Sequence, residues 1–455
     1  MPENVIFENQ NSNQNDPNIE RGKFNFKKIF IGLGIGIVLI FMLIFILGKG
    51  QNQKDATLVW WGLWEDNATM QPLIDDFEKQ NPHIKIKYTK QDPLRYRDTV
   101  MTRIGNGTGP DIFLYHNTWT STLTKILSPL PQDVISVADF TKNYYPVVQN
   151  DLVQNGAIYG VPLGVDSIAL YINMDMLHAA GLSVPKDWNE FVDAAKKLTV
   201  RDPDTNKMKI SGAAMGTYNN VNHAPDILSL MFLQQGVNLK KISESKDNLT
   251  AAITFYTAFS SGKDAVWDSA LDNSLLEFAR GNVAMYFGFS WDSFIIEQYK
   301  KNNNFKYEIY PVPSLVENRS VTVASYWVEG VSKRSKYQKE AMKFMNYLTQ
   351  KETLQKFYSE ASKTRLFGEP YPRVDMADML KDNPLVYPFV GQMDNAGSSY
   401  FASGTYDGDT GLNKRANTYL ENAINGIVKE NSSADSAVKT LQVGLTKVLQ
   451  ENGIQ

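Results

Sequence analysis

Cysteine is absent from the 455 residues, and histidine occurs only four times. The first absence excludes disulfides, thiolate zinc sites, iron–sulfur clusters, cysteine nucleophiles and a lipid-modified cysteine anchor. The second leaves little for a multi-histidine metal site, so we expect neither a metal nor another cofactor. An excess of positive charge is also missing, since 46 basic and 49 acidic side chains give a net charge of −3. Nucleic acid is therefore not an expected partner.

The N-terminal segment has the pattern of a membrane anchor. Residues 1–28 are rich in Asn and Gln and end in a basic cluster, which predicts a disordered cytoplasmic tail. The uncharged run from Ile29 to Leu47 is long enough to cross a hydrocarbon layer of roughly 30 Å as a helix. Because the basic residues precede it, the rest of the chain is expected outside the cell. We predict a transmembrane helix over 29–48 and a linker over 49–56, with a cleaved signal peptide as the alternative.

Strand and helix signals alternate through the rest of the chain, where apolar residues make up enough of the sequence for a large core. Apolar or alternating runs predict strands at Thr57–Trp61, 84–88, Asp111–Tyr115 and Ile168–Tyr171. Helices are predicted between them, the first with Pro72 in its first turn. This alternation indicates a parallel sheet covered by helices. No internal repeat or long linker interrupts it, so the sequence predicts two closely joined α/β lobes.

Four stretches of the chain, taken in order, carry a family resemblance. They are 58–61 with 73–82, 109–112, 158–188, and 278–285 with 311–313. Each is weak alone, but together they resemble the extracellular solute-binding proteins of carbohydrate ABC transporters, the maltose-binding-protein-like family. The resemblance covers residues 57–450 and departs at the N-terminus. Relatives are held by a lipidated cysteine or released into the periplasm, whereas here an apolar helix is expected to replace both.

The resemblance implies a two-lobe periplasmic-binding-protein-like fold that closes on its ligand like a Venus flytrap. Its hinge strands are expected near Val165–Leu170, Val321–Tyr326 and Arg365–Arg373. Lobe one then comprises residues 57–165 and 322–365, and lobe two comprises 166–321 and 366–455. The family also implies a monomer that works with ABC permease subunits and their ATPase.

Aromatic residues beside acids or amides at the ends of strands are the candidate sugar contacts. A sugar ring offers an apolar face to an aromatic ring and a rim of hydroxyls to carboxylates and amides, and open α/β sheets bind ligands beyond the carboxyl ends of their strands. The candidates are Trp64, Glu65, Tyr115, Asn117, Trp119, Asp166, Tyr218, Trp291, Asp292, Trp327, Glu329 and Tyr406. Core packing, a hinge salt bridge or a solvated turn is the alternative for each.

The sequence thus predicts an anchored binding protein that captures a carbohydrate, an oligosaccharide in our interpretation, and delivers it to a permease. The chain has no GxxxxGK[ST] loop, so the energy must come from another protein. A sensor or adhesin with the same fold is one alternative, and polyamines or sugar acids are alternative ligands, the acids through Arg365 or Arg373. A glycoside hydrolase would need two carboxylates about 5–10 Å apart, such as two of Glu65, Asp166 and Asp292. No enzymatic activity is expected.

Overall fold

The computed structural model describes residues 55–300, 304–315 and 321–454. The predicted cytoplasmic tail at 1–28, the predicted anchor at 29–48 and nearly all of the linker lie outside these residues. Within the described ranges, no helix combines the length and the apolar character needed to cross a membrane.

The first sheet is built from the N-terminal strands and one strand from far along the chain. Its order is β2-β1-β3-β13-β6. The strands are β1 (Ala56–Gly62), β2 (Ile84–Lys90), β3 (Ile112–His116), β6 (Val161–Pro162) and β13 (Trp327–Val331). β1 runs parallel to β2 and β3, but β13 runs antiparallel to both β3 and β6. The three predicted N-terminal strands and their parallel pairing are confirmed, but the sheet as a whole is mixed because β13 enters from the opposite direction.

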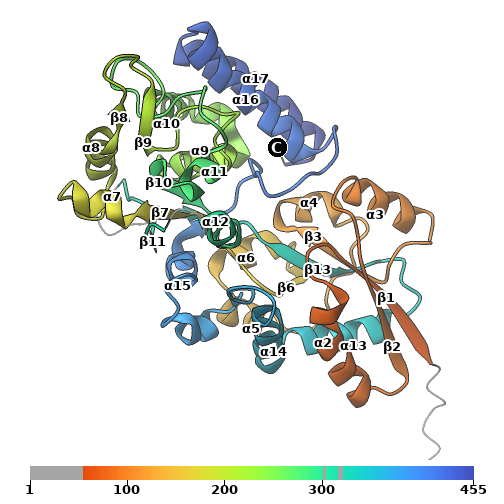
Figure 1. Cartoon of the computed structure of the whole chain (residues 1–455). Coiled ribbons are helices and arrows are strands. Elements are labelled where there is room, and N and C mark those ends of the chain that lie inside the picture. The colour runs from red at the N-terminus through yellow and green to blue at the C-terminus, as the bar shows by residue number, and fades with distance from the viewer. Residues whose placement is uncertain (1–54, 301–303, 316–320, 455) are drawn as a thin grey trace, which may run out of the picture. The chain divides into compact units, whose positions relative to one another are not determined.

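Helices surround the first sheet, as Figure 1 shows for α2, α13 and α14. They are α2 (Asn67–Gln80), α3 (Tyr96–Gly105), α4 (Thr120–Leu123), α5 (Val137–Asn143), α6 (Pro146–Leu152), α13 (Gln338–Leu348) and α14 (Lys351–Ser362). The short helix α15 (Tyr387–Val390) contributes Val390 to the core of this sheet and Phe389 to the core of the other. Shorter elements are η1 (Asn117–Trp119), η3 (Val374–Leu380), η4 (Met393–Asn395), β4 (Val153–Gln154) and β5 (Ala157–Ile158). Pro72 lies inside α2, not in its first turn, because the Asp66 carbonyl already accepts the backbone N–H groups of Thr69 and Met70.

The second sheet has the order β11-β7-β10-β9-β8. Its strands are β7 (Ala169–Asn173), β8 (Val200–Arg201), β9 (Met208–Ala213), β10 (Val283–Gly288) and β11 (Tyr307–Tyr310). β7 is antiparallel to β10 and β11, and only β9 and β10 form a parallel pair. This sheet is therefore also mixed.

The helices of the second sheet include two long ones at the C-terminal end, α16 and α17, which lie side by side (Figure 1). The helices are α7 (Met174–Ala179), α8 (Trp188–Leu198), α9 (Ala224–Gln234), α10 (Lys246–Ala258), α11 (Ser274–Ala279), α12 (Asp292–Lys300), α16 (Leu412–Glu430), α17 (Ala434–Glu451) and the 3-10 helix η2 (Leu239–Glu244). Asp187 caps the start of α8, since its carboxylate accepts the N–H groups of Asn189 and Glu190 at 2.8 and 2.9 Å.

Each sheet has its own hydrophobic core, and we call the two parts the first and second lobes. The first core contains Trp60 and Phe113, and the second contains Ile172 and Phe191. The chain leaves the first core after Val165. The buried apolar side chains from 168 to 323 that enter a core lie in the second one, whereas the partly buried Phe294 of α12 packs against the first.

The first two connections between the lobes lie side by side. Ser167 pairs antiparallel with Ala324, and the N–H of Ile168 donates to the carbonyl of Val323 at 2.9 Å. Strand β12 (Thr322–Val323) also pairs in parallel with β14 (Ala396–Gly397). These positions agree with the first two predicted hinges.

The third connection falls later than expected. Phe367 and Tyr371 still pack in the first core, where Arg373 pairs with the backbone of Tyr144. The chain therefore crosses near β14 and not at 365–373. The other predicted lobe boundaries stay a prediction. For the second segment of lobe one, predicted as 322–365, the composition of the first core favours an end later than residue 365.

We expect Gly212→Ala to destabilise the second lobe. A Cβ on Gly212 of β9 would lie 1.8 Å from the carbonyl oxygen of Ala195 in α8, so strand and helix must move apart. Overpacking of this kind costs about 3 kcal/mol of unfolding free energy. Gly105→Ala is the control, because a Cβ there meets nothing within 4 Å. Urea unfolding of the chain from residue 55 onward, which contains both cores, measures the two effects, and equal unfolding midpoints would contradict the packing described.

Candidate functional site

Three candidate tryptophans meet at one edge of the first sheet, and we call Trp64, Trp119 and Trp327 the tryptophan cluster. Trp327 begins β13, Trp64 follows β1, and Trp119 lies in η1 after β3. The Trp327 ring centroid is 5.4 Å from that of Trp64 and 5.4 Å from that of Trp119, both in edge-on contacts. Trp64 is 47% exposed. The structure thus brings together three residues that the sequence singled out separately.

The cluster is held by buried polar groups. Nε1 of Trp119 donates to Oδ1 of Asn413 at 3.0 Å, and the Arg97 guanidinium lies 5.8 Å from the Trp119 ring centroid. The ring of His116 lies 5.2 Å from Trp327, and its Nε2 is 3.1 Å from the hydroxyl oxygen of Ser325. Burial lowers the pKa of His116 to about 3, so this imidazole is neutral.

Tyr115 near the end of β3 and Asn117 at the start of η1 are buried. The Asn117 side-chain amide donates to Oδ2 of Asp151 at 2.9 Å and to Oγ of Ser398 at 3.0 Å. The Tyr115 hydroxyl reaches the Tyr159 carbonyl at 3.4 Å. Because their polar atoms already have protein partners, these two residues fit a role in shaping the site, and ligand contact stays a prediction for both.

Asp166 lies where the first connection leaves the first core, and it binds a loop of the second lobe. Its Oδ1 accepts the N–H of Ser167 at 2.7 Å, and its Oδ2 accepts the N–H and the hydroxyl of Ser290 at 2.9 and 2.6 Å. Burial raises the pKa of Asp166 well above its ordinary value, despite these hydrogen bonds. Ser290 is next to Trp291, so this carboxyl group joins the hinge to the candidate ring of the second lobe.

Trp291 stacks on Phe289, with ring centroids 4.4 Å apart and an interplanar angle of 12°. The Asp292 carboxylate accepts hydrogen bonds from the Tyr286 hydroxyl at 2.8 Å and from the Phe289 N–H at 3.2 Å. Asp292 is 1% exposed, whereas Trp291 is only partly buried. Trp291 is therefore the residue of this pair that a ligand could reach, whereas the buried Asp292 holds the segment 289–291 in place through its hydrogen bonds.

The side chains of three further candidates, Glu65, Tyr218 and Tyr406, bind other parts of the protein and not the two aromatic groups. Oε1 of Glu65 is 3.0 Å from Nη2 of Arg365. The Tyr218 hydroxyl donates to the Asn417 carbonyl in α16 at 3.2 Å. Tyr406 is 38% exposed, and its hydroxyl donates to Asp409 at 2.8 Å. Their contact with a ligand stays a prediction.

Glu329 is a buried carboxyl group in the first core. Its Oε2 accepts the indole N–H of Trp60 at 2.8 Å, and the residue is 3% exposed. Burial raises the pKa of Glu329 to about 8, although the hydrogen bond from Trp60 acts to lower it. Glu329 lies two residues after Trp327 in β13, so we expect it to support the cluster through this strand.

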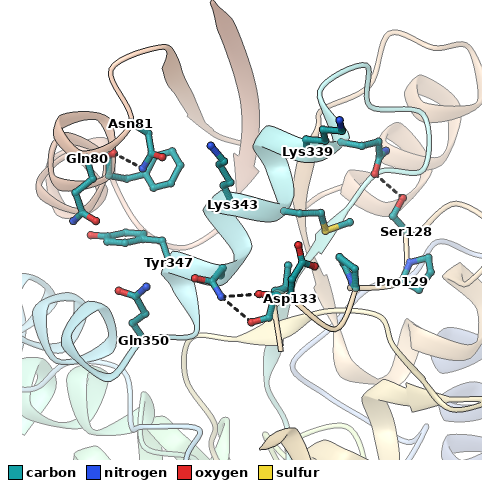
Figure 2. Close-up of a pocket in the computed structure, with 15 residues that line it drawn as sticks. Gln80, Asn81, Ser128, Pro129, Asp133, Lys339, Lys343, Tyr347 and Gln350 are labelled. Carbon is teal, nitrogen blue, oxygen red and sulfur yellow. Dashed lines mark hydrogen bonds between the residues drawn. The ribbon is translucent and has the colours of Figure 1, made fainter. Parts of the chain in front are cut away.

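A cavity of about 770 Å³ opens elsewhere on the first lobe, between α2, α13 and the segment 128–134 (Figure 2). Its walls include Phe77, Met342 and Tyr347, with Lys339 and Lys343 also lining it. None of the twelve candidate residues lines this cavity. It is therefore separate from the predicted site.

Sequence reasoning missed four residues that support the two aromatic groups: Arg97, Asp151, His223 and Asn413. His223 binds Asp292, with Nε2 and Oδ2 2.7 Å apart. A lone buried histidine carries no motif, and Asn413 lies 294 positions from the tryptophan it binds. No group of three or more His, Asp or Glu in the described ranges is arranged to hold a metal ion.

Two mixed β-sheets, each covered by helices and joined by three connections, form the two-lobe α/β architecture of solute-binding proteins. Similarity to known proteins identifies the family. Residues 61–355 match the family of bacterial extracellular solute-binding proteins, and the chain belongs to it. This is a family of binding proteins and not of enzymes, and its extracellular character places the binding domain outside the cytoplasm.

Individual relatives agree with this assignment. The chain is 25% identical over 308 residues to the "Multiple sugar-binding protein" of Streptococcus mutans serotype c, covering 65% of this chain and 71% of that protein. The structure resembles the sugar-binding protein MalE from Xanthomonas citri with a TM-score of 0.71, 20% identity, and coverage of 87% of this chain and 98% of that one. It resembles the GacH receptor of Streptomyces glaucescens with a TM-score of 0.65, 20% identity, and coverage of 87% and 99%. At these identities the two structures show the shared two-lobe fold.

We expect Glu329→Gln to change how stability depends on pH. The unfolded chain loses the Glu329 proton near its ordinary value of 4.5, but the folded chain keeps it until about pH 8. Folding therefore binds a proton in that window, and wild-type stability falls as pH rises, by about 1.4 kcal/mol per pH unit relative to the variant. Urea unfolding of both proteins at several pH values between about 5 and 9 measures the difference. Parallel curves across this range would show that the carboxyl group is not protonated in the fold.

Proposed function

We propose that this chain is a membrane-anchored extracytoplasmic binding protein that captures a neutral oligosaccharide between its lobes and delivers it to an ABC transporter permease. The observation that carries the proposal is the pair of aromatic groups, with the tryptophan cluster on the first lobe and the Trp291–Phe289 stack on the second. Aromatic faces are the surfaces that sugar rings stack on, and two such groups across a hinge provide room for more than one ring.

A chain of contacts supports a common site for the two groups. His116 contacts Trp327, and its imidazole binds the hydroxyl of Ser325. Gly404 approaches both lobes, because a Cβ on it would lie 3.5 Å from the Ser325 hydroxyl and 3.8 Å from the Trp291 ring. The two aromatic groups are thus separated by a few side chains and not by the width of the protein.

The charged groups near the hinge favour a neutral ligand. Nη2 of Arg365 lies 3.0 Å from Glu65 and 2.8 Å from Glu369, and Arg373 binds both carboxylate oxygens of Asp375 at 2.9 Å. Both arginines are neutralised by the protein's own carboxylates, which disfavours a clamp on a sugar acid.

The carboxyl groups are equally poor partners for a polyamine. Asp166 and Asp292 are buried and accept hydrogen bonds from the protein. A polyamine would need carboxylates that face one another across the site with their oxygens free, and these two do not meet that condition.

The relatives support the ligand class. One is named for binding multiple sugars, and similar solved structures are described with acarbose, maltotetraose or mannotriose bound. For this chain we carry over the class, oligosaccharide, and not a particular sugar. Residues 29–48 would hold the domain at the membrane in the absence of any cysteine for lipidation.

We expect neutral oligosaccharides to stabilise the chain from residue 55 onward. A ligand at one hundred times its dissociation constant adds about 2.7 kcal/mol to the unfolding free energy, which raises the melting temperature by degrees. The panel contains maltotriose, maltotetraose, mannotriose and acarbose, with glucuronic acid and spermidine as charged probes. A shift with the charged probes alone would contradict the neutral class. No shift with any member would favour a surface sensor or adhesin instead.

Trp64→Ala tests the site itself. We expect it to weaken sugar binding about tenfold, near 1.4 kcal/mol, because an exposed stacking ring is lost while the core stays intact. Tyr299→Ala is the matched control, since Tyr299 in α12 is 50% exposed and Trp64 is 47% exposed. Calorimetric titration measures both affinities. Equal affinities for the two variants would remove the tryptophan cluster from the site.

The anchor has its own test. We expect the full chain to sediment with membranes and to need detergent for its release, because the predicted span is as long as the hydrocarbon layer. High salt should leave it in the membrane fraction. The same chain without residues 29–48 should be found in the soluble fraction, and a full chain that is soluble without detergent would contradict the anchor.

A further inference from the structure

A buried histidine connects the three segments that surround Trp291. His223 precedes α9 and is 4% exposed. Its Nε2 is 2.7 Å from Oδ2 of Asp292 at the start of α12, and its Nδ1 is 2.7 Å from the hydroxyl oxygen of Ser403. Its ring meets Phe289 edge-on at 5.1 Å and lies 6.4 Å from Trp291. The histidine therefore contacts the stack on one side and the loop before α16 on the other.

We propose that His223 is a positioning residue for ligand binding, which in its protonated form holds both Trp291 and the loop at Ser403 in the binding arrangement. The inference rests on the proposed function, because Trp291 is taken as the ring on which the ligand stacks. His223 acts through its neighbours and need not touch the ligand.

The groups that face His223 are mostly acidic. The titratable ones are Asp292 of α12, Asp226 of α9 with Oδ2 3.9 Å from Nδ1, Tyr286 of β10 with its ring 6.3 Å away, and Asp166 of the hinge. The neutral side-chain amide of Asn222 also lies 3.0 Å from Nε2. Burial by itself lowers the pKa of His223, but the Asp292 carboxylate, followed by Asp226 and Asp166, raises it above the ordinary value. The imidazolium thus persists to a higher pH than in a free histidine.

Loss of the proton changes the hydrogen bonds of the loop. The imidazolium donates from Nε2 to Asp292 and from Nδ1 to the Ser403 hydroxyl oxygen. Oδ2 of Asp226 also accepts the N–H of Ser403 at 3.1 Å. When Nδ1 is deprotonated it becomes an acceptor, and the Ser403 hydroxyl must turn its hydrogen towards Nδ1. The Ser403 hydroxyl thus changes from acceptor to donor towards His223, and the charge-assisted hydrogen bond at Nδ1 becomes a neutral one.

This change reaches the proposed site through the next residue. Gly404 approaches the ring of Trp291 and the hydroxyl of Ser325, which in turn binds His116 beside the tryptophan cluster. A weaker hold on Ser403 therefore alters the surroundings of Trp291. We expect ligand affinity to fall as pH rises through the raised pKa of His223.

The experiment is ¹⁹F NMR of the chain from residue 55 onward, labelled with 5-fluorotryptophan, with Trp291 assigned by Trp291→Phe. The sequence has only eight tryptophans, whose ¹⁹F signals can be followed, and its four histidine rings are followed by ¹H–¹⁵N NMR of the imidazoles. We expect the Trp291 signal of the wild type to titrate with the same midpoint as the His223 ring, above about 6.5. His223→Gln should shift that signal and abolish its titration. His178→Gln, at an exposed position of α7 in the same lobe, should do neither.

A second variant covers the case in which His223→Gln fails to fold. Ser403→Ala leaves Asp292 and His223 in place and removes only the partner of Nδ1, and we expect it to move the Trp291 midpoint. A Trp291 signal that ignores the His223 titration, or one that still titrates in His223→Gln, would overturn the proposal.

Affinity for maltotetraose separates this inference from the proposed function. Weaker binding in His223→Gln by about tenfold, with wild-type binding in His178→Gln, supports both. Wild-type affinity in His223→Gln together with an unchanged Trp291 signal overturns the positioning role and leaves the sugar site standing. A Trp291 signal that follows His223 in a protein that binds no sugar of the panel supports the coupling and contradicts the proposed function.

Discussion

The Asp166 carboxyl group and its backbone link the hinge to both aromatic groups. Its side chain accepts two hydrogen bonds from Ser290, next to Trp291, and its carbonyl accepts the N–H of Ser325 at 3.0 Å. Ser325 in turn binds His116 beside the tryptophan cluster. Hinges absorb backbone changes in a few residues. Asp166 lies at such a crossing, and its hydrogen bonds connect it to the segments that carry the aromatic groups of both lobes.

Charge near the hinge is satisfied within the protein before any ligand arrives. Buried carboxyl groups such as those of Asp166 and Asp292 are costly unless hydrogen bonds compensate them, and here serines, a tyrosine and a histidine supply those bonds. The groups that remain accessible are largely aromatic. A binding surface of this kind selects by shape, stacking and hydroxyl geometry, which suits a neutral sugar better than an ion.

Much of the fold follows from local sequence, and so do the accessible rings. Alternation at Ile84, Ile86 and Tyr88 gives strand β2, and the aromatic residues after β1 and β3 do meet at one edge of the sheet. The direction of β13 and the late third connection could not be predicted, because they depend on pairing with strands far away in the chain. His223 and Asn413 were missed for the same reason. A buried polar residue shows its importance only when its distant partners are known.

The most direct test of the account is whether the lobes move on a sugar. Because the chain has no cysteine, two can be introduced at exposed positions and spin-labelled without interference. A label at Lys79 of α2 and one at Lys439 of α17 report between the lobes, and a pair at Lys79 and Thr99 reports within the first lobe. Saturating maltotetraose is predicted to change the first distance distribution, measured by pulsed electron spin resonance, and to leave the second unchanged. Saturated binding with both distributions unchanged would contradict capture between the lobes.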